Sequence, residues 1–176
     1  MSVKSTPTRY GSVAILIHWA SALAVILAFA AGFTVADIAP PERQAPILVA
    51  HITLGTIVLV LTLLRIIWWI VADKHPSPPA DQPRWQRVTA NIVHLALYVI
   101  LLLMASSGIM TLVLSGALPA ILGGTVPDFS ELIPRMAHGV MSKILLALFA
   151  VHVGAALYHQ LVRRDHLLAR MGLGSA

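Results

Sequence analysis

Four long apolar stretches dominate this sequence, and each is long enough to cross a lipid bilayer as a helix. They run over residues 11–36, 47–72, 85–114 and 136–162. A membrane-spanning helix needs about 20 mostly apolar residues, and 58% of this chain is hydrophobic while only 11% is charged. Segments rich in proline and glycine separate the stretches. The sequence therefore predicts a single all-α membrane domain over residues 1–176, a four-helix bundle in the bilayer.

Basic residues cluster on one side of the predicted spans. That side carries Lys4, Arg9, Lys74, Arg84, Arg87, Arg163, Arg164 and Arg170, whereas the other side carries only Arg43 and Arg135. Because Lys and Arg are enriched in cytoplasmic loops, we expect both termini to lie in the cytoplasm. The net charge of +5 could indicate a protein that binds nucleic acid, but the basic residues cluster at the helix ends. We therefore interpret them as residues that flank membrane spans.

Four histidines lie inside the predicted spans, at two depths. His18 and His152 fall in the cytoplasmic half, and His51 and His138 fall near the outer face. Imidazole is costly in hydrocarbon unless it is bonded. His138 and His152 share one helix, about 40° apart around its axis and about 21 Å apart along it. One helix can thus serve two sites, with His18 paired to His152 and His51 paired to His138.

Each of these histidines is followed one helical turn later by a small residue. The four small residues are Ala22, Gly55, Ser142 and Ala156. A flat macrocycle on an axial histidine needs such gaps in the helix surface, so we interpret the two pairs as axial ligands of two b-type haems. The chain has no cysteine, which excludes iron–sulfur ligation and covalent c-type attachment. Zinc is disfavoured because its sites gather three or four ligands at one depth. Helix–helix hydrogen bonding without a cofactor is the remaining alternative.

Further polar side chains in the spans are expected near these haems. His94 precedes the bulky Tyr98 by one turn, which favours a hydrogen bond to a propionate or a quinone over ligation. His159 is interpreted as a propionate partner, as part of a quinone pocket, or as an interface histidine. Arg65 lies deep in an apolar run and is expected to neutralise a propionate of the inner haem or to reach the headgroups. Lys143, in the outer half, is expected to neutralise an outer propionate or to attract an anionic substrate.

The order and spacing of these residues resemble the bacterial cytochrome b561 family over nearly the whole chain. The resemblance is carried by Ile17-His18-Trp19, by His51 followed by Gly55 and Arg65, by His94-Leu95-Ala96-Leu97-Tyr98, and by His138 with His152-Val153-Gly154-Ala155-Ala156-Leu157-Tyr158-His159. It implies a multi-pass protein of the bacterial inner membrane whose bundle encloses two b-type haems. By position, it implies His18 and His152 as ligands of one haem, and His51 and His138 as ligands of the other.

The resemblance also implies a function in electron transport. Some members of the family pass electrons between ubiquinone and a periplasmic partner, and one looks like a superoxide oxidase, which takes an electron from superoxide and reduces quinone. We therefore expect an oxidoreductase that takes electrons from a periplasmic donor, such as superoxide, and reduces ubiquinone, with Arg135 and Lys143 attracting the anion. The outer segments disfavour an anionic substrate, because they carry Asp37, Glu42, Asp128 and Glu131 against Arg43 and Arg135. The alternative is a haem-bearing anchor subunit that serves a separate periplasmic dehydrogenase or cytochrome c.

Overall fold

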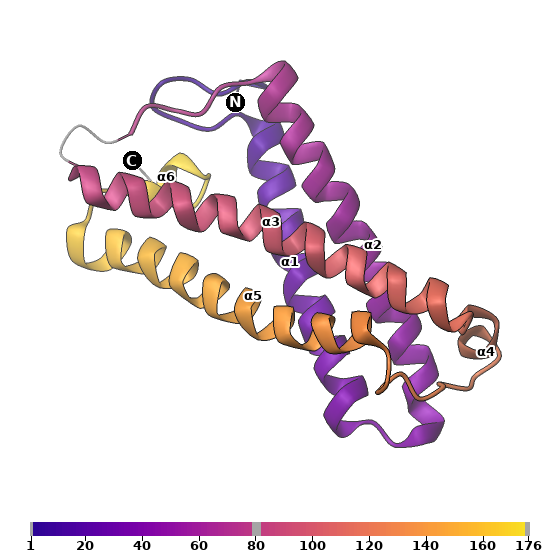
Figure 1. Ribbon diagram of the computed structural model, residues 1–176. Coiled ribbons are helices and arrows are strands. Elements are labelled where there is room, and N and C mark those ends of the chain that lie inside the picture. Colours follow the sequence, from indigo (N-terminus) through magenta and orange to yellow (C-terminus); the bar gives the residue numbers. More distant parts are fainter. Residues whose placement is uncertain (1, 79–81, 175–176) are drawn as a thin grey trace.

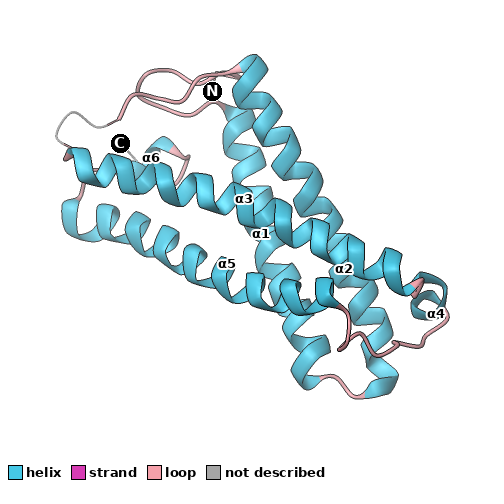
Figure 2. Cartoon of the chain, viewed as in Figure 1, coloured by secondary structure: helices cyan, strands magenta, loops and turns pink. Residues whose placement is uncertain are grey.

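The computed structural model describes residues 2–78 and 82–174, and it contains helices and no strand within those residues (Figure 2). The long helices are α1 (Ser12–Phe33), α2 (Pro41–Ile67), α3 (Arg84–Ser115) and α5 (Ile133–Tyr158). Short π-helical turns extend three of them: η1 (Thr34–Ile38), η2 (Trp68–Ala72) and η3 (His159–Arg163). Two short helices, α4 (Leu118–Leu122) and α6 (Leu167–Arg170), complete the chain. The predicted all-α fold class is confirmed.

The long helices have the length and composition of membrane spans. Their most apolar windows have mean hydropathies between 2.0 and 2.5. Large apolar side chains point outward along all four, and Leu16 and Val113, for example, are more than two-thirds exposed. Such a surface is unfavourable in water and is suited to contact with lipid tails. The chain is therefore a multi-pass membrane protein.

The second span begins earlier than the sequence predicts. α2 starts at Pro41, and Pro46 lies inside the helix rather than in the preceding turn. Pro41 occupies the first helical turn, where its missing N–H would have no partner in any case. Pro46 stands only one turn further along, so a single intrahelical hydrogen bond is lost there and the helix continues.

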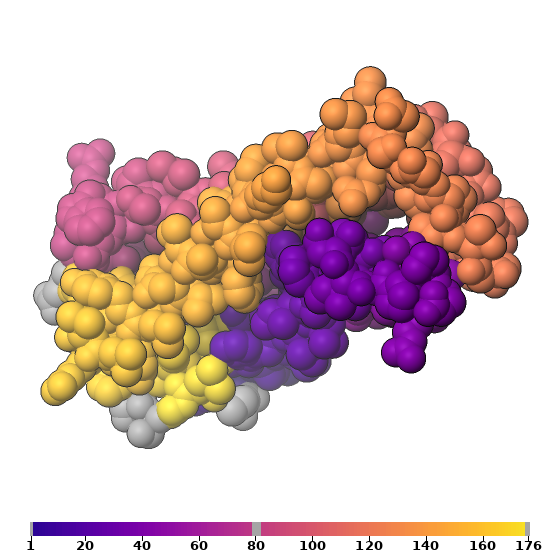
Figure 3. Space-filling view, turned by 90° about the horizontal axis from the view of Figure 1, so that it is seen from below, coloured from indigo at the N-terminus to yellow at the C-terminus, as the bar shows by residue number. Residues whose placement is uncertain are grey.

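Two antiparallel helical hairpins make up the bundle (Figure 1). α1 packs mainly on α2, α3 packs mainly on α5, and contacts between α2 and α3 join the hairpins. A small apolar cluster of Ala24, Val25 and Val58, with Leu101 packed against it, fills this junction. Figure 3 shows α5, in orange to yellow, crossing the molecule beside the α1–α2 turn. Among the described residues, however, the α5 backbone makes few close contacts with α1 or α2.

Both termini lie at the same end of the bundle, which we call the terminal end (Figure 1). Arg170 connects three segments there, because its guanidinium donates hydrogen bonds to the backbone carbonyls of Pro7, Thr8 and Ser77 at 2.7–3.1 Å. The Trp19 indole N–H donates to a carbonyl of the C-terminal segment at 3.0 Å. These bonds hold the N-terminal segment, the α2–α3 loop and the C-terminal segment together over this end.

Asp73 holds the N-terminal segment against the end of α2. Its carboxylate accepts hydrogen bonds from the Ser5 backbone N–H at 3.0 Å, the Ser5 hydroxyl at 2.7 Å and the Trp68 indole N–H at 3.2 Å. Burial acts to raise the pKa of Asp73, but these hydrogen bonds, with one from Lys74, outweigh it and lower the pKa below its ordinary value. The carboxylate is therefore charged at neutral pH, and its stabilising effect is lost only as the pH falls through that lowered pKa.

Candidate cofactor site

Two pairs of histidine rings face each other across the separation between α5 and the α1–α2 hairpin. The ring centres of His18 and His152 are 6.2 Å apart, and those of His51 and His138 are 5.9 Å apart. We call the first the terminal-end pair and the second the opposite-end pair. α5 contributes one histidine to each pair, as the spacing of fourteen residues predicts.

The ring separations fit two imidazoles bound to one metal ion. A metal–imidazole nitrogen bond is about 2 Å and the ring centre lies about 1 Å behind that nitrogen, so two opposed rings on one ion have centres about 6 Å apart. Both pairs match this value. No direct hydrogen bond joins the rings of either pair among the described residues, so the pairs are not explained by bonding of one imidazole to another. The geometry suits an iron atom between the rings, as in a haem with two axial histidines.

The opposite-end pair has the hydrogen bonds that iron-binding histidines need. His51 Nδ1 lies 2.8 Å from the Ala28 carbonyl oxygen. His138 Nδ1 lies 3.1 Å from the Met104 carbonyl oxygen and 3.0 Å from the Ser107 hydroxyl. A proton on each Nδ1 satisfies these carbonyls and leaves the Nε2 lone pair available for a metal. Both rings are thus held in one tautomer and one orientation by neighbouring helices.

Glycines make room for the rings of the opposite-end pair. A Cβ added at Gly32 of α1 would lie 2.8 Å from His51 Cε1, which is closer than real Cβ contacts. A Cβ added at Gly108 of α3 would lie 3.4 Å from His138 Cε1. Gly55, one turn after His51, has no atom within 4 Å of an added Cβ. The space beside His51 is therefore open on the face where a macrocycle has to lie.

The terminal-end pair has a different environment, because an arginine reaches it. Arg65 Nη1 lies 3.0 Å from His18 Nδ1. Because a guanidinium can only donate, this contact leaves the His18 proton on Nε2, so binding of iron through Nε2 requires that proton to move to Nδ1 and Arg65 to bond another acceptor, such as a propionate. The His94 ring centre lies 5.3 Å from that of His152, and the Arg65 guanidinium lies 5.8 Å from the Tyr98 ring centre. His94 and Arg65 thus both lie beside the terminal-end pair, at the depth that the sequence predicts.

Beside this site, two buried donors have no hydrogen-bond partner among the described residues. They are Arg65 Nε and Trp69 Nε1, which lie one helical turn apart on the same side of the α2–η2 helix. The Trp69 ring is fixed by stacking against His75, with centres 3.9 Å apart, and by an edge contact with Tyr10. An unsatisfied buried donor costs free energy, and a carboxylate would satisfy both. These donors suit a haem propionate.

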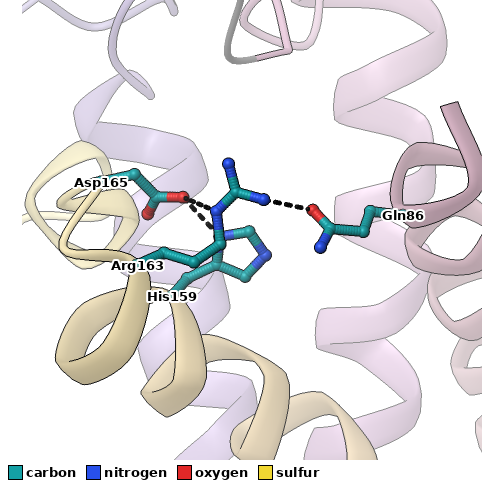
Figure 4. A network of polar contacts seen from close by, with 4 residues as sticks. All are labelled: Gln86, His159, Arg163 and Asp165. Carbon is teal, nitrogen blue, oxygen red and sulfur yellow. Dashed lines mark hydrogen bonds and ion pairs between the residues drawn. The ribbon is translucent and has the colours of Figure 1, made fainter. Parts of the chain in front are cut away.

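His159 lies further toward the terminal end, within a polar network shown in Figure 4. Its ring is buried, and its Nδ1 lies 2.5 Å from Asp165 Oδ2. Arg163 Nε lies 3.5 Å from the same oxygen, and Arg163 Nη1 donates to the Gln86 amide oxygen of α3 at 2.9 Å. His159 is therefore part of an internal network.

Arg135 and Lys143, the two cations that the sequence predicts near the opposite end, do not contact each other. Arg135 is half-buried, and its guanidinium lies against Gly139 one turn further along α5. Lys143 is exposed, more than two helical turns from Arg135. They stand as separate positive charges on one helix.

Several residues that shape these sites are absent from the sequence-based set. Gly32 and Gly108 are glycines inside apolar helices, which is a known signal of close helix approach. Asp165 follows His159 by six residues, just beyond the helix end, and this spacing gives no signal in the sequence that the two side chains meet. The Ala28 and Met104 carbonyls that bond the histidines are backbone groups, so no residue type in the sequence marks their positions.

Comparison with known proteins gives matches over nearly the whole chain. The sequence profile of a family described as prokaryotic cytochrome b561 matches residues 9–174. Cytochrome b561 homolog 1 and homolog 2 of Escherichia coli (strain K12) are 30% and 28% identical to this chain, covering 93% and 97% of it and 96% and 95% of themselves. A probable superoxide oxidase CybB of Yersinia pestis is 26% identical, covering 93% of this chain and 95% of its own length. All four paired histidines lie within the matched region.

Proposed function

Since the chain belongs to the prokaryotic cytochrome b561 family, we propose that it holds two b-type haems and transfers electrons one at a time from a periplasmic donor to ubiquinone. Membership makes it a haem protein of the bacterial inner membrane with a role in electron transport. The number of haems is supported by the two histidine pairs, each with the ring separation of an axially ligated iron. The proposal rests mainly on this arrangement of two histidine pairs at two levels of one bundle.

The protein's part in this chemistry is to hold, orient and separate the two centres. Haem, when bound, supplies one-electron oxidation and reduction. His18 with His152, and His51 with His138, would hold the two haems, and a haem held by two histidines would favour electron transfer over binding of oxygen. The apolar helices exclude water around both centres. Because α5 contributes to both, their relative positions are set by one rigid element.

The direction of transfer follows from the orientation that we propose. With both termini in the cytoplasm, the opposite-end pair lies near the periplasm and the terminal-end pair near the cytoplasm. The donor then reaches the opposite end first. We propose ubiquinone near the terminal-end pair, where His94 and His159 offer ring nitrogens.

Superoxide is the donor that we favour. The name of the Yersinia pestis relative supports it, and Arg135 and Lys143 lie on the opposite-end half of α5 as positive charges for an anion. Two superoxide anions, one ubiquinone and two protons would give two molecules of oxygen and one ubiquinol, so electrons and protons balance. The acidic residues nearby, such as Asp128 and Glu131, oppose this attraction.

A kinetic assay on the purified protein tests this function and separates it from the anchor-subunit alternative. We expect superoxide to reduce the haems of the isolated chain, and added ubiquinone to be reduced with catalytic turnover. Arg135→Gln should slow the superoxide step, and the rate should fall with ionic strength as for steered association. Haems that superoxide leaves oxidised, but that a periplasmic cytochrome or dehydrogenase reduces, would instead support an anchor subunit.

Replacing Arg65 should lower the reduction potential of the terminal-end haem. A cation beside His18 disfavours the oxidised iron, which carries one more positive charge than the reduced iron. We expect Arg65→Gln to lower this potential by about 60 mV, a tenfold change in the one-electron equilibrium. Arg65→Lys, which keeps the charge, should change it much less. Spectroelectrochemical titration of both haems is the measurement, and equal potentials in the wild type and the glutamine variant would contradict the assignment.

A further inference from the structure

A buried hydroxyl group on α3 contacts one histidine of the opposite-end pair. Among the described residues, the buried side chains that carry a hydroxyl are those of Thr62, Ser107 and Thr111. Thr62 and Thr111 each donate to a carbonyl of their own helix and form no second hydrogen bond within those residues. Ser107 differs, because its Oγ also lies 3.0 Å from His138 Nδ1 on α5, the helix that packs beside α3 (Figure 1).

The Ser107 hydroxyl turns a lone pair, and not its proton, toward this ring. Its O–H donates to the Met104 carbonyl oxygen at 2.8 Å. Because a hydroxyl has only one proton, Oγ can then only accept from His138 Nδ1–H. This arrangement needs the tautomer with its proton on Nδ1, which leaves the Nε2 lone pair for iron. The Ser107 hydroxyl and the Met104 carbonyl therefore share one N–H, at 3.0 and 3.1 Å.

Local contacts on α3 hold Ser107 in this position. Thr111, one turn later, donates to the Ser107 carbonyl oxygen at 2.9 Å. Gly108 leaves room for the ring, since a Cβ added there would lie 3.4 Å from His138 Cε1. Ser106, the preceding residue, is exposed and bonds only a carbonyl one turn earlier on its own helix. Of these two consecutive serines, only Ser107 faces the histidine.

A second acceptor on Nδ1–H changes what the His138 ring provides to a metal on Nε2. An N–H shared by two acceptors is more strongly polarised, so the ring gives more electron density to the metal. The hydroxyl oxygen also presents the negative end of its dipole to the ring, in an apolar bundle where such interactions are strengthened. Both effects stabilise oxidised iron, which carries one more positive charge than reduced iron, and they therefore lower the reduction potential.

We propose that Ser107 is a positioning residue that acts through His138 to lower the reduction potential of the opposite-end haem, an inference that rests on the proposed two-haem arrangement. Arg65 places a positive charge beside the terminal-end pair, which raises the potential there. The two side chains act in the same sense, because each makes electron transfer from the opposite end to the terminal end more favourable. In that step one iron loses an electron and the other gains it, and no atom is transferred.

Spectroelectrochemical titration of the haem-loaded Ser107→Ala variant tests this proposal. Alanine keeps the space beside the ring and removes the hydroxyl, while the Met104 carbonyl still accepts from Nδ1–H. We expect both haems to be retained and the opposite-end potential to rise by about 60 mV, a tenfold change in its one-electron equilibrium. The terminal-end potential should stay unchanged. The haem that shifts is identified because Arg65→Gln leaves its potential unchanged.

Two further variants separate the hydroxyl's effect on the ring from a general effect of altering α3. Ser107→Thr keeps a hydroxyl and should stay close to the wild-type potential. Ser106→Ala removes the adjacent, exposed hydroxyl and should leave both potentials unchanged. A rise in the opposite-end potential that is equal in Ser106→Ala and Ser107→Ala would overturn the proposal.

The remaining outcomes distinguish failure of this inference from failure of the proposed function. An unchanged or lowered opposite-end potential in Ser107→Ala would overturn the role of Ser107 and leave the two-haem function intact. Loss of the opposite-end haem from this variant would also overturn it, because the hydroxyl would then be needed to hold the ring for binding. A wild-type protein that binds fewer than two haems would overturn both.

Discussion

We expect the His138→Ala variant to hold one haem per chain where the wild type holds two. His138 supplies one of the two rings of the opposite-end pair, and its Nδ1 is already bonded to the Met104 carbonyl, so its Nε2 is the nitrogen available to iron. The remaining haem should keep the spectrum of the terminal-end site, because His152 lies about 21 Å along α5 from His138, and His18 lies beside His152. Haem content per chain after pyridine extraction is the measurement.

Two further variants test whether the loss of haem depends on which histidine is replaced. His152→Ala should give the reverse pattern, with loss of the terminal-end haem and retention of the other. His166→Asn is the control, because His166 is an exposed histidine in a left-handed conformation that asparagine tolerates. It should keep both haems. An unchanged haem content in His138→Ala would show that the histidine pairing is wrong.

The Gly32→Ala variant should weaken haem retention at the opposite-end pair without removing any ligand. The added Cβ would lie 2.8 Å from His51 Cε1, and the ring is fixed by the Ala28 carbonyl, so it has to leave its present position. Displacement of a ligand from its supporting hydrogen bond typically costs about 10–100-fold in metal affinity. We expect a similar loss here, measured as the rate at which an apo-myoglobin trap removes haem from detergent-solubilised protein.

Gly154→Ala is the matched control for this substitution. Gly154 also lies in a membrane helix, two residues after a paired histidine, but an added Cβ there has no atom within 4 Å. Haem loss from this variant should equal that of the wild type. Equal haem loss from Gly32→Ala and Gly154→Ala would mean that the close approach of Gly32 to His51 has no role in holding the ring.

The sequence predicts most of the architecture because hydropathy and helical periodicity are local properties. The length of the apolar stretches predicts four spans, and the spacing between His138 and His152 predicts that one helix serves both pairs. Pro46 shows the limit of such local signals, since a proline in the second turn costs one hydrogen bond and does not end the helix. A helix start that is placed from the prolines alone is therefore too late in the sequence, as the start of α2 at Pro41 shows.

The finer features of the site depend on contacts between helices, which no local pattern encodes. The Ala28 carbonyl binds His51 because α1 and α2 pack at one particular register. Arg65 is expected near the inner site, but its approach to His18 rather than to the headgroups follows from the packing of α2 against α1. Asp165 faces His159 only because the chain reverses after η3. Each of these depends on three-dimensional packing rather than on residue type.

The central claim is that two histidine pairs bind iron at two levels of this membrane bundle, and haem analysis of the purified wild-type protein tests it most directly. Haem content and electron paramagnetic resonance of the oxidised protein, after expression with ample haem supply, should show two haems per chain. Both should give the low-spin signals of iron with two axial imidazoles. A colourless protein, or a single haem with a high-spin signal, would contradict the claim.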